Sequence, residues 1–154
     1  MNLVLFFVFI VVIFFTPMNT KFLQSTQRKK SAMKLRIKGN SLRMRLTKTD
    51  VSKLAQTGYL EEQTIFPNNK FVYCLQADEG INTLQATFEI NKITILVSKT
   101  FIKDWPDNDV IGLDSKMPLT TKDSLYLLIE KDFVCLDEST DDQSDNFENP
   151  NKIC

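Results

Sequence analysis

Residues 33–46 read MKLRIKGNSLRMRL, two runs of alternating basic and apolar side chains on either side of Gly39-Asn40. Such alternation is typical of strands with one buried face, and a glycine at the first central position suits a two-residue type II′ turn. A turn of this length fixes the register of the hairpin and places four cations on one face. These cations are Lys34, Arg36, Arg43 and Arg45.

This cationic face needs an explanation, because like charges opposite each other on a sheet cost roughly 0.2–1 kcal/mol per pair. One interpretation is a solvated face with long side chains splayed apart. A second is docking of the chain's own acidic tail, for instance Asp137, Asp141 or Asp145. A third is an external anion: phosphate, an anionic metabolite, nucleic acid or anionic lipid. Nucleic acid is the weakest of these, because no aromatic platform lies between the cations.

Charge is distributed unevenly along a chain in which 19 cations balance 19 acids. Residues 1–49 contain ten Lys and Arg and no acid, whereas residues 130–154 contain eight acids and two lysines. A basic beginning and an acidic end within one small protein favour internal neutralisation over nucleic-acid binding.

Several chemistries are excluded by composition. Histidine is absent, which rules out Ser-His-Asp and Cys-His catalysis and histidine-ligated zinc. Three cysteines, Cys74, Cys135 and Cys154, form no CxxC pair and are too scattered to predict a zinc site. They are either inert reduced thiols, or Cys135 and Cys154 form a disulfide that ties the tail back onto the sheet.

The only paired carboxylates that share a strand face are Glu130 and Asp132. Two carboxylates two residues apart could hold a divalent metal or act as an acid and base pair. The alternative is a strand end that is held by salt bridges.

The first 32 residues contain an unbroken apolar run from Leu3 to Phe15. As a helix this run spans about 20 Å, less than the roughly 30 Å of a bilayer core. Three interpretations remain: a short membrane anchor over residues 3–18, a secretion signal, or a start of translation at Met33. Cations downstream of the run would keep the following domain on the cytoplasmic side of a membrane.

The remaining pattern predicts an α+β, mainly β domain over residues 33–136, followed by an acidic, mobile tail over residues 137–154. We expect about seven strands and two short helices, arranged as an antiparallel curled sheet or a partly open barrel. The expected helices are residues 48–57 and 100–105. The expected strands after the first hairpin are residues 59–66, 70–77, 84–90, 93–99, 110–113 and 125–136.

The chain from residue 33 resembles a family of small bacterial proteins of unknown function. The resemblance rests on the basic IKGNS hairpin, the LTKTDVSKLAQTG helix over residues 46–58, the EKDFVCL strand over residues 130–136, and a DNFENP segment and terminal cysteine in the tail. It covers residues 33–154 and implies no activity, no cofactor and no catalytic residue.

We therefore expect a non-enzymatic binding domain whose cationic face takes an anionic ligand, an anionic partner or a second copy of the chain. One alternative is a divalent-metal-dependent enzyme that uses Glu130 and Asp132. The other is a membrane-tethered domain anchored by residues 3–18. No catalytic residue and no cofactor is predicted, and the domain is expected in the cytoplasm, either free or held at the inner face of the membrane.

Overall fold

The structure is a computed structural model that describes residues 32–135 and 142–150. These residues form eight strands, two α-helices and one 3₁₀ turn. In chain order the elements are β1 (Lys34–Ile37), β2 (Ser41–Leu46), α1 (Lys48–Thr57), β3 (Tyr59–Phe66), β4 (Asn69–Asp78), β5 (Gln85–Glu89), β6 (Lys92–Ser98), α2 (Lys99–Asp104), η1 (Trp105–Asp107), β7 (Gly112–Pro118) and β8 (Ser124–Lys131).

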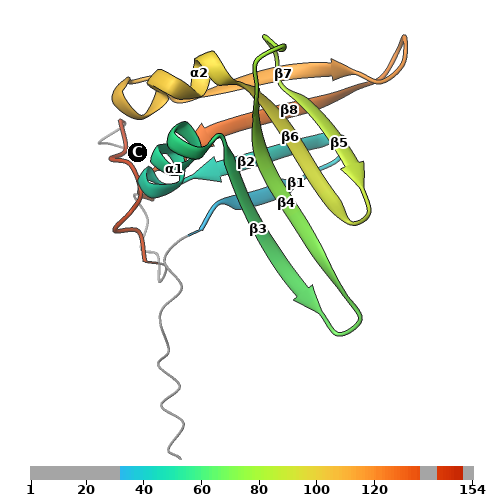
Figure 1. The fold of residues 1–154 in the computed structure, drawn as a ribbon, viewed down its shortest axis with the longest axis horizontal. Coiled ribbons are helices and arrows are strands. Elements are labelled where there is room, and N and C mark those ends of the chain that lie inside the picture. Colours follow the sequence, from blue (N-terminus) through green and yellow to red (C-terminus); the bar gives the residue numbers. More distant parts are fainter. Residues whose placement is uncertain (1–31, 136–141, 151–154) are drawn as a thin grey trace, which may run out of the picture.

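The strands form two four-stranded sheets that face each other across the core (Figure 1). The first, sheet A, has the order β1-β2-β8-β7, and the second, sheet B, has the order β3-β4-β6-β5. Each sheet curls, and neither closes into a barrel, so the predicted α+β, mainly β class is confirmed. The parallel pairings β2–β8 and β4–β6 were not expected, because strands far apart in sequence leave no local turn signal.

The first hairpin has the predicted register, with Lys34 opposite Arg45 and Arg36 opposite Arg43. Gly39 has a φ of +54°, whereas Asn40 does not adopt a positive φ. A positive φ at the first central position alone is the signature of a type II′ turn. The hairpin prediction is therefore confirmed.

Helix α1 has the predicted bounds because both of its ends carry a specific stop signal. Thr47 and Asp50 form a capping box at its start, and Gly58 ends it in the left-handed conformation at a φ of +70°. Burial raises the pKa of the Asp50 carboxyl above its ordinary value of 3.8, although hydrogen bonds with Thr47 oppose this effect. The nearby Asp145 carboxylate raises it further.

Three later elements differ from the sequence prediction. Helix α2 spans Lys99–Asp104 instead of the predicted residues 100–105, and β7 begins at Gly112 and continues to Pro118 instead of covering residues 110–113. Strand β8 ends at Lys131 instead of continuing to residue 136. It ends early because the following residues leave the sheet, and Phe133 forms a bridge with Phe147 from near the C-terminus.

Residues 142–150, part of the predicted tail, pack against the domain. The Phe147 backbone N–H donates to the Asp132 carbonyl at 2.8 Å, and the Val134 N–H donates to the Phe147 carbonyl at 2.9 Å. Asp145 accepts hydrogen bonds from the backbone N–H and hydroxyl of Thr49. This part of the tail therefore lies across the end of β8 and the start of α1.

The two halves of the domain have the same topology, although the sequence shows no repeat. Each consists of a hairpin, a helix and a second hairpin, and exchanging the halves converts the strand order of sheet A into that of sheet B. Leu46 and Val97 are equivalent, since each directly precedes the N-cap residue of its helix. The arrangement is thus a pseudo-two-fold in which α1 packs on α2.

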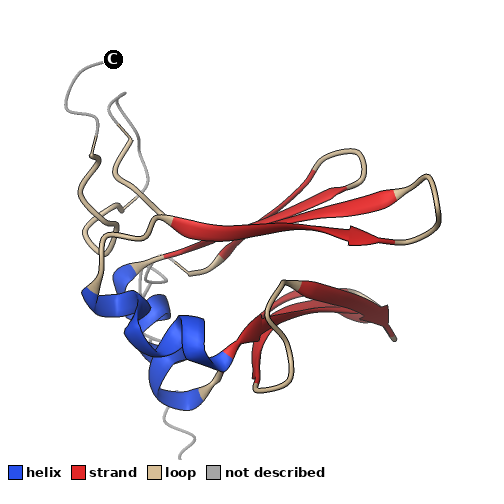
Figure 2. Cartoon of the chain, turned by 90° about the horizontal axis from the view of Figure 1, so that it is seen from above, coloured by secondary structure: helices blue, strands red, loops and turns tan. Residues whose placement is uncertain are grey.

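The core lies between the sheets and is closed at one end by the helices (Figure 2). The four hairpin turns lie at the opposite end, where the strands of the two sheets fan out in different directions (Figure 1). Trp105, fully buried beside Phe101, donates its indole N–H to the Val110 carbonyl at 2.9 Å. The helical end of the domain is therefore well packed around Trp105.

Candidate functional site

The four cations of the first hairpin lie on the outer face of sheet A, away from the core. Their apolar neighbours Met44 and Leu46 are fully buried on the inner face. Because β2 pairs with β8 in parallel, Glu130 stands directly opposite Arg45 on the same outer face. The fold thus brings the basic beginning of the domain against one of its acidic residues.

Glu130 joins two of the cations. Its Oε1 atom accepts hydrogen bonds from Nε of Arg43 at 2.7 Å and from Nε of Arg45 at 2.9 Å. A terminal nitrogen of Arg43 also contacts this oxygen. One carboxylate therefore offsets the repulsion between two neighbouring guanidinium groups.

Asp132 holds a third cation. The Lys34 ammonium lies 3.0 Å from Oδ2 of Asp132, a carboxyl group that is almost completely buried. Among the residues that the structure describes, this oxygen has no hydrogen-bond partner, so its contact with Lys34 is an ion pair. Arg36 is exposed and forms no ion pair with any residue that the structure describes.

The acids of this cluster lie beneath the cations. The side chains of Arg43 and Arg45 are 32% and 39% exposed, whereas that of Glu130 is 11% exposed. Four cations and two carboxylates leave a formal charge of +2 on this part of the sheet. The surface that solvent meets is therefore positive, and we call Lys34, Arg36, Arg43 and Arg45 the cationic surface.

The tail was one predicted source of neutralising acid, and the structure gives a different one. Asp145 lies at the start of α1, where it binds Thr49. Asp137 and Asp141 lie outside the described residues. The chain's own acids do pair with the cations, but the ones that do so among the described residues are Glu130 and Asp132.

A polar pocket of about 320 Å³ opens beside this cluster. Arg43, Arg45, Glu130 and Asp132 form one side of it, and residues 133–135 with Asn149 and Pro150 form the other. The second side was missed from the sequence, because the pairing of Phe133 with Phe147 brings it into place. An aromatic residue inside an otherwise acidic tail was the available signal.

The fold itself does not require charges at these positions, as the pseudo-two-fold shows. The positions of sheet B equivalent to the four cations and to Glu130 are neutral, whereas the position equivalent to Asp132 is Asp78. With Leu46 aligned on Val97 and the observed strand registers, Arg43 corresponds to Thr94, Arg45 to Leu96, Glu130 to Gln76, Lys34 to Gln85 and Arg36 to Thr87. Two halves with one topology thus differ in whether cations occupy these four positions, although the outer face of sheet B has its own ion pair between Lys92 and Glu61.

Glu130 and Asp132 were also predicted as a metal or acid and base pair. Both carboxylates are engaged by cations, and no cluster of three or more His, Cys, Asp or Glu suited to a metal occurs within residues 32–135 and 142–150. Cys135 is exposed, and Cys154 lies outside the described residues, so their disulfide stays a prediction.

Lys131 is a buried cation at the rim of the polar pocket. Its ammonium donates to the Asn108 carbonyl and lies 5.0 Å from the centre of the Phe147 ring. Burial lowers the pKa of Lys131, and the nearby Asp109 carboxylate partly opposes this effect. These contacts tie the C-terminal segment to the segment before β7.

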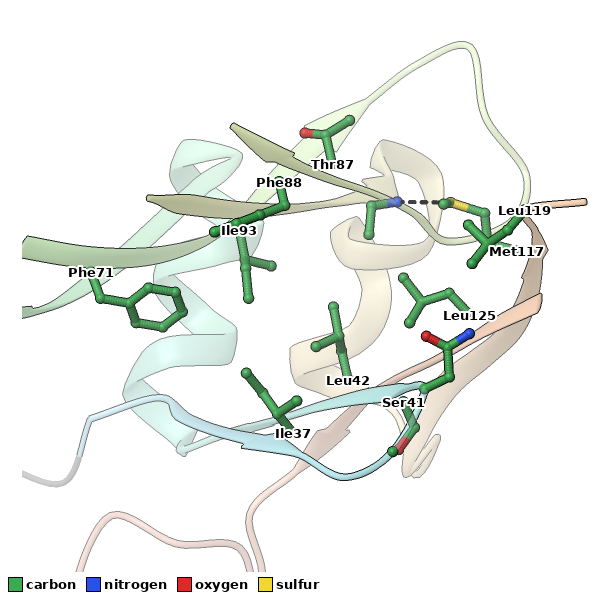
Figure 3. Close-up of a pocket in the computed structure, with 13 residues that line it drawn as sticks. Ile37, Ser41, Leu42, Phe71, Thr87, Phe88, Ile93, Met117, Leu119 and Leu125 are labelled. Carbon is green, nitrogen blue, oxygen red and sulfur yellow. Dashed lines mark hydrogen bonds between the residues drawn. The ribbon is translucent and has the colours of Figure 1, made fainter. Parts of the chain in front are cut away.

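A second, apolar cleft of about 470 Å³ lies between the diverging ends of the sheets (Figure 3). Ile37, Leu42, Phe71, Phe88 and Leu125 are among the side chains that line it. The predicted strands 84–90 and 93–99 share an apolar face, which is expected to be covered. The face is buried at the end of the hairpin nearest the helices, whereas Phe88 and Ile90 near the turn are exposed.

Two mixed sheets, a helical end and a carboxylate-supported cationic surface define a small α+β, mainly β domain. Over residues 33–151 the chain matches the family described as "Family of unknown function (DUF7009)", and it belongs to this family. No curated protein and no solved structure matches the chain.

The predicted membrane anchor over residues 3–18 lies outside the described residues. Of the helices that the structure does describe, none has the length and apolar character needed to cross a membrane.

Proposed function

We propose that the domain is a non-enzymatic binding module whose cationic surface takes an anionic ligand, or an anionic group of a partner. The observation that carries this proposal is the contrast between the halves. The positions of sheet B equivalent to the four cations are neutral, so these cations are not a requirement of the topology. Charges that a fold does not need are candidates for binding.

The geometry suits an anion with oxygen acceptors. A guanidinium group carries five N–H donors in a planar fork, which can bind phosphate or carboxylate with two parallel hydrogen bonds. Glu130 fixes Arg43 and Arg45 through their Nε atoms, so less side-chain freedom is lost when a ligand binds. The polar pocket beside them has room for a small anion or a terminal anionic group.

The metal-dependent alternative lacks comparable support. A metal at Glu130 and Asp132 would have to displace Arg43, Arg45 and Lys34 from the two carboxylates. It would also bind beside a net positive charge, which disfavours a divalent cation.

The experiment is a calorimetric titration of the full chain with inorganic phosphate at low ionic strength. The first variant is Arg36→Gln, since Arg36 forms no ion pair with the described residues and its loss leaves no buried acid unpaired. The second is the double variant Glu130→Gln, Arg45→Gln, which removes a pair together. Loss of one charge-assisted contact, worth about 1.5 kcal/mol, weakens binding about tenfold.

Lys53→Gln is the matched control, because it removes one exposed cation from α1, away from sheet A. It should bind phosphate as the wild type does. If Arg36→Gln is more stable than the wild type, and neither it nor the double variant binds phosphate less tightly, the surface is merely a solvated face and the proposal is wrong.

A further inference from the structure

The edge of the domain opposite the helices is formed by the four hairpin turns (Figures 1 and 2). Each turn exposes a large apolar side chain. We call this region the four-turn edge, made of residues 37–40, 66–70, 89–92 and 119–123. Its exposed apolar side chains are Ile37, Phe66, Ile90 and Leu119. Single exposed apolar residues are ordinary, but one at every turn along one edge suggests an interaction surface.

Ile90 lies in a backbone conformation that is unfavourable for its residue type. Ile90 and Asn91 have φ values of +45° and +62°, as the two central residues of a type I′ turn require. Glycine and asparagine adopt this conformation readily, whereas a β-branched residue there is strained. The Ile90 side chain is 96% exposed and therefore gains no burial in return.

The four-turn edge is also positively charged. Its residues include four lysines, Lys38, Lys70, Lys92 and Lys122, and two acids, Glu89 and Asp123, and Lys92 is paired with Glu61 of β3. Facing copies of this edge would repel each other, which disfavours a second copy of the chain as the partner. Apolar side chains interleaved with lysines instead match an interface that is apolar inside and anionic at its surface.

The apolar surface continues from the turns into the molecule. Ile37, Phe88 and Leu119 line the mouth of the apolar cleft, and Leu42 and Ile93 lie deeper within it (Figure 3). The exposed residues at the tips and those of the cleft thus form one apolar region between the diverging sheets.

We propose that the four-turn edge docks on the surface of a bilayer that contains anionic lipids. The apolar tips enter the boundary between headgroups and acyl chains, and the lysines contact the anionic headgroups. This surface is separate from the cationic surface on the outer face of sheet A, and it uses residues between Ile37 and Asp123.

The experiment measures co-sedimentation of the full chain with vesicles of phosphatidylcholine mixed with phosphatidylglycerol, and with vesicles of phosphatidylcholine alone. The wild type should bind the mixed vesicles more tightly. Ile90→Asn suits the backbone of the turn, so it keeps the fold while removing an inserted side chain, and it should weaken binding about tenfold. Lys38→Gln should weaken binding to mixed vesicles roughly fivefold and leave binding to neutral vesicles unchanged.

Val110→Asn is the control, because Val110 is an exposed apolar residue near the helical end. It should bind as the wild type does. Equal binding by the wild type, Ile90→Asn and Lys38→Gln would assign any vesicle binding to another part of the chain and overturn the proposal. A wild type that is dimeric without vesicles and becomes monomeric with Ile90→Asn would identify a second copy as the partner instead. Arg36→Gln, which tests the phosphate proposal, should leave vesicle binding unchanged.

Discussion

Replacing Ile90 by asparagine should stabilise the protein, although it removes a large apolar residue. The left-handed conformation costs an ordinary L-residue roughly 1–2 kcal/mol, and asparagine bears much less of this cost. Because Ile90 is 96% exposed at a φ of +45°, the substitution forfeits almost no buried apolar area. The free energy of unfolding should therefore rise by about 1 kcal/mol.

For a domain of this size, that gain corresponds to an increase in Tm of about 3–6 °C. Thermal unfolding followed by circular dichroism measures the shift, and urea titration measures the free energy. Ile65→Asn is the comparison, because Ile65 is 77% exposed but lies in β3, where the backbone is extended. It should be neutral or slightly destabilising, since asparagine fits strands poorly. An Ile90→Asn protein that melts at or below the wild-type temperature would refute the account of strain at this turn.

Three further substitutions test other parts of the structure. Gly112→Ala should lower the free energy of unfolding, measured by urea titration, by about 1–3 kcal/mol. The reason is that the added Cβ would lie 2.2 Å from the Ile129 carbonyl oxygen. A neutral effect would show that β7 moves away freely. Glu130→Gln should lower the free energy of unfolding by about 1–3 kcal/mol, because it leaves Arg43 and Arg45 unpaired. The loss should be smaller at high salt, since both arginines are partly exposed. Equal stability of variant and wild type at low salt would contradict the role of this carboxylate. Burial raises the pKa of Asp50 in the folded protein above its ordinary value of 3.8. The wild type should therefore lose stability relative to Asp50→Asn as pH rises from below 3.8 through the raised pKa. A difference in stability between the two proteins that stays constant across this range would contradict the burial argument.

The elements that could be predicted to the residue are those with local signals at both ends. The hairpin register follows from Gly39-Asn40, and the bounds of α1 follow from Thr47 and Gly58. The pairing of β2 with β8 could not be predicted, because about eighty residues separate the two strands and no turn joins them. The end of β8 was missed for the same reason, since it depends on Phe147.

The candidate site was predicted in pieces. The four cations, and Glu130 with Asp132, were recognised as two separate candidates with different chemistries. Only the parallel pairing of β2 with β8 unites them, because it sets Glu130 beside Arg43 and Arg45. A strand pattern shows which face a residue occupies, but it does not show which distant strand lies next to it.

The parallel pairing of β2 with β8 also has a consequence for the order of events during biosynthesis. Sheet B is made from one continuous stretch, β3 to β6, and can assemble while the ribosome is still translating. Sheet A joins the first strands to the last, so Arg43 and Arg45 have no Glu130 beside them until nearly the whole chain has emerged. Shortened chains that end before β8 would therefore present bare guanidinium groups and an unpaired strand edge, which makes them ready targets for quality control.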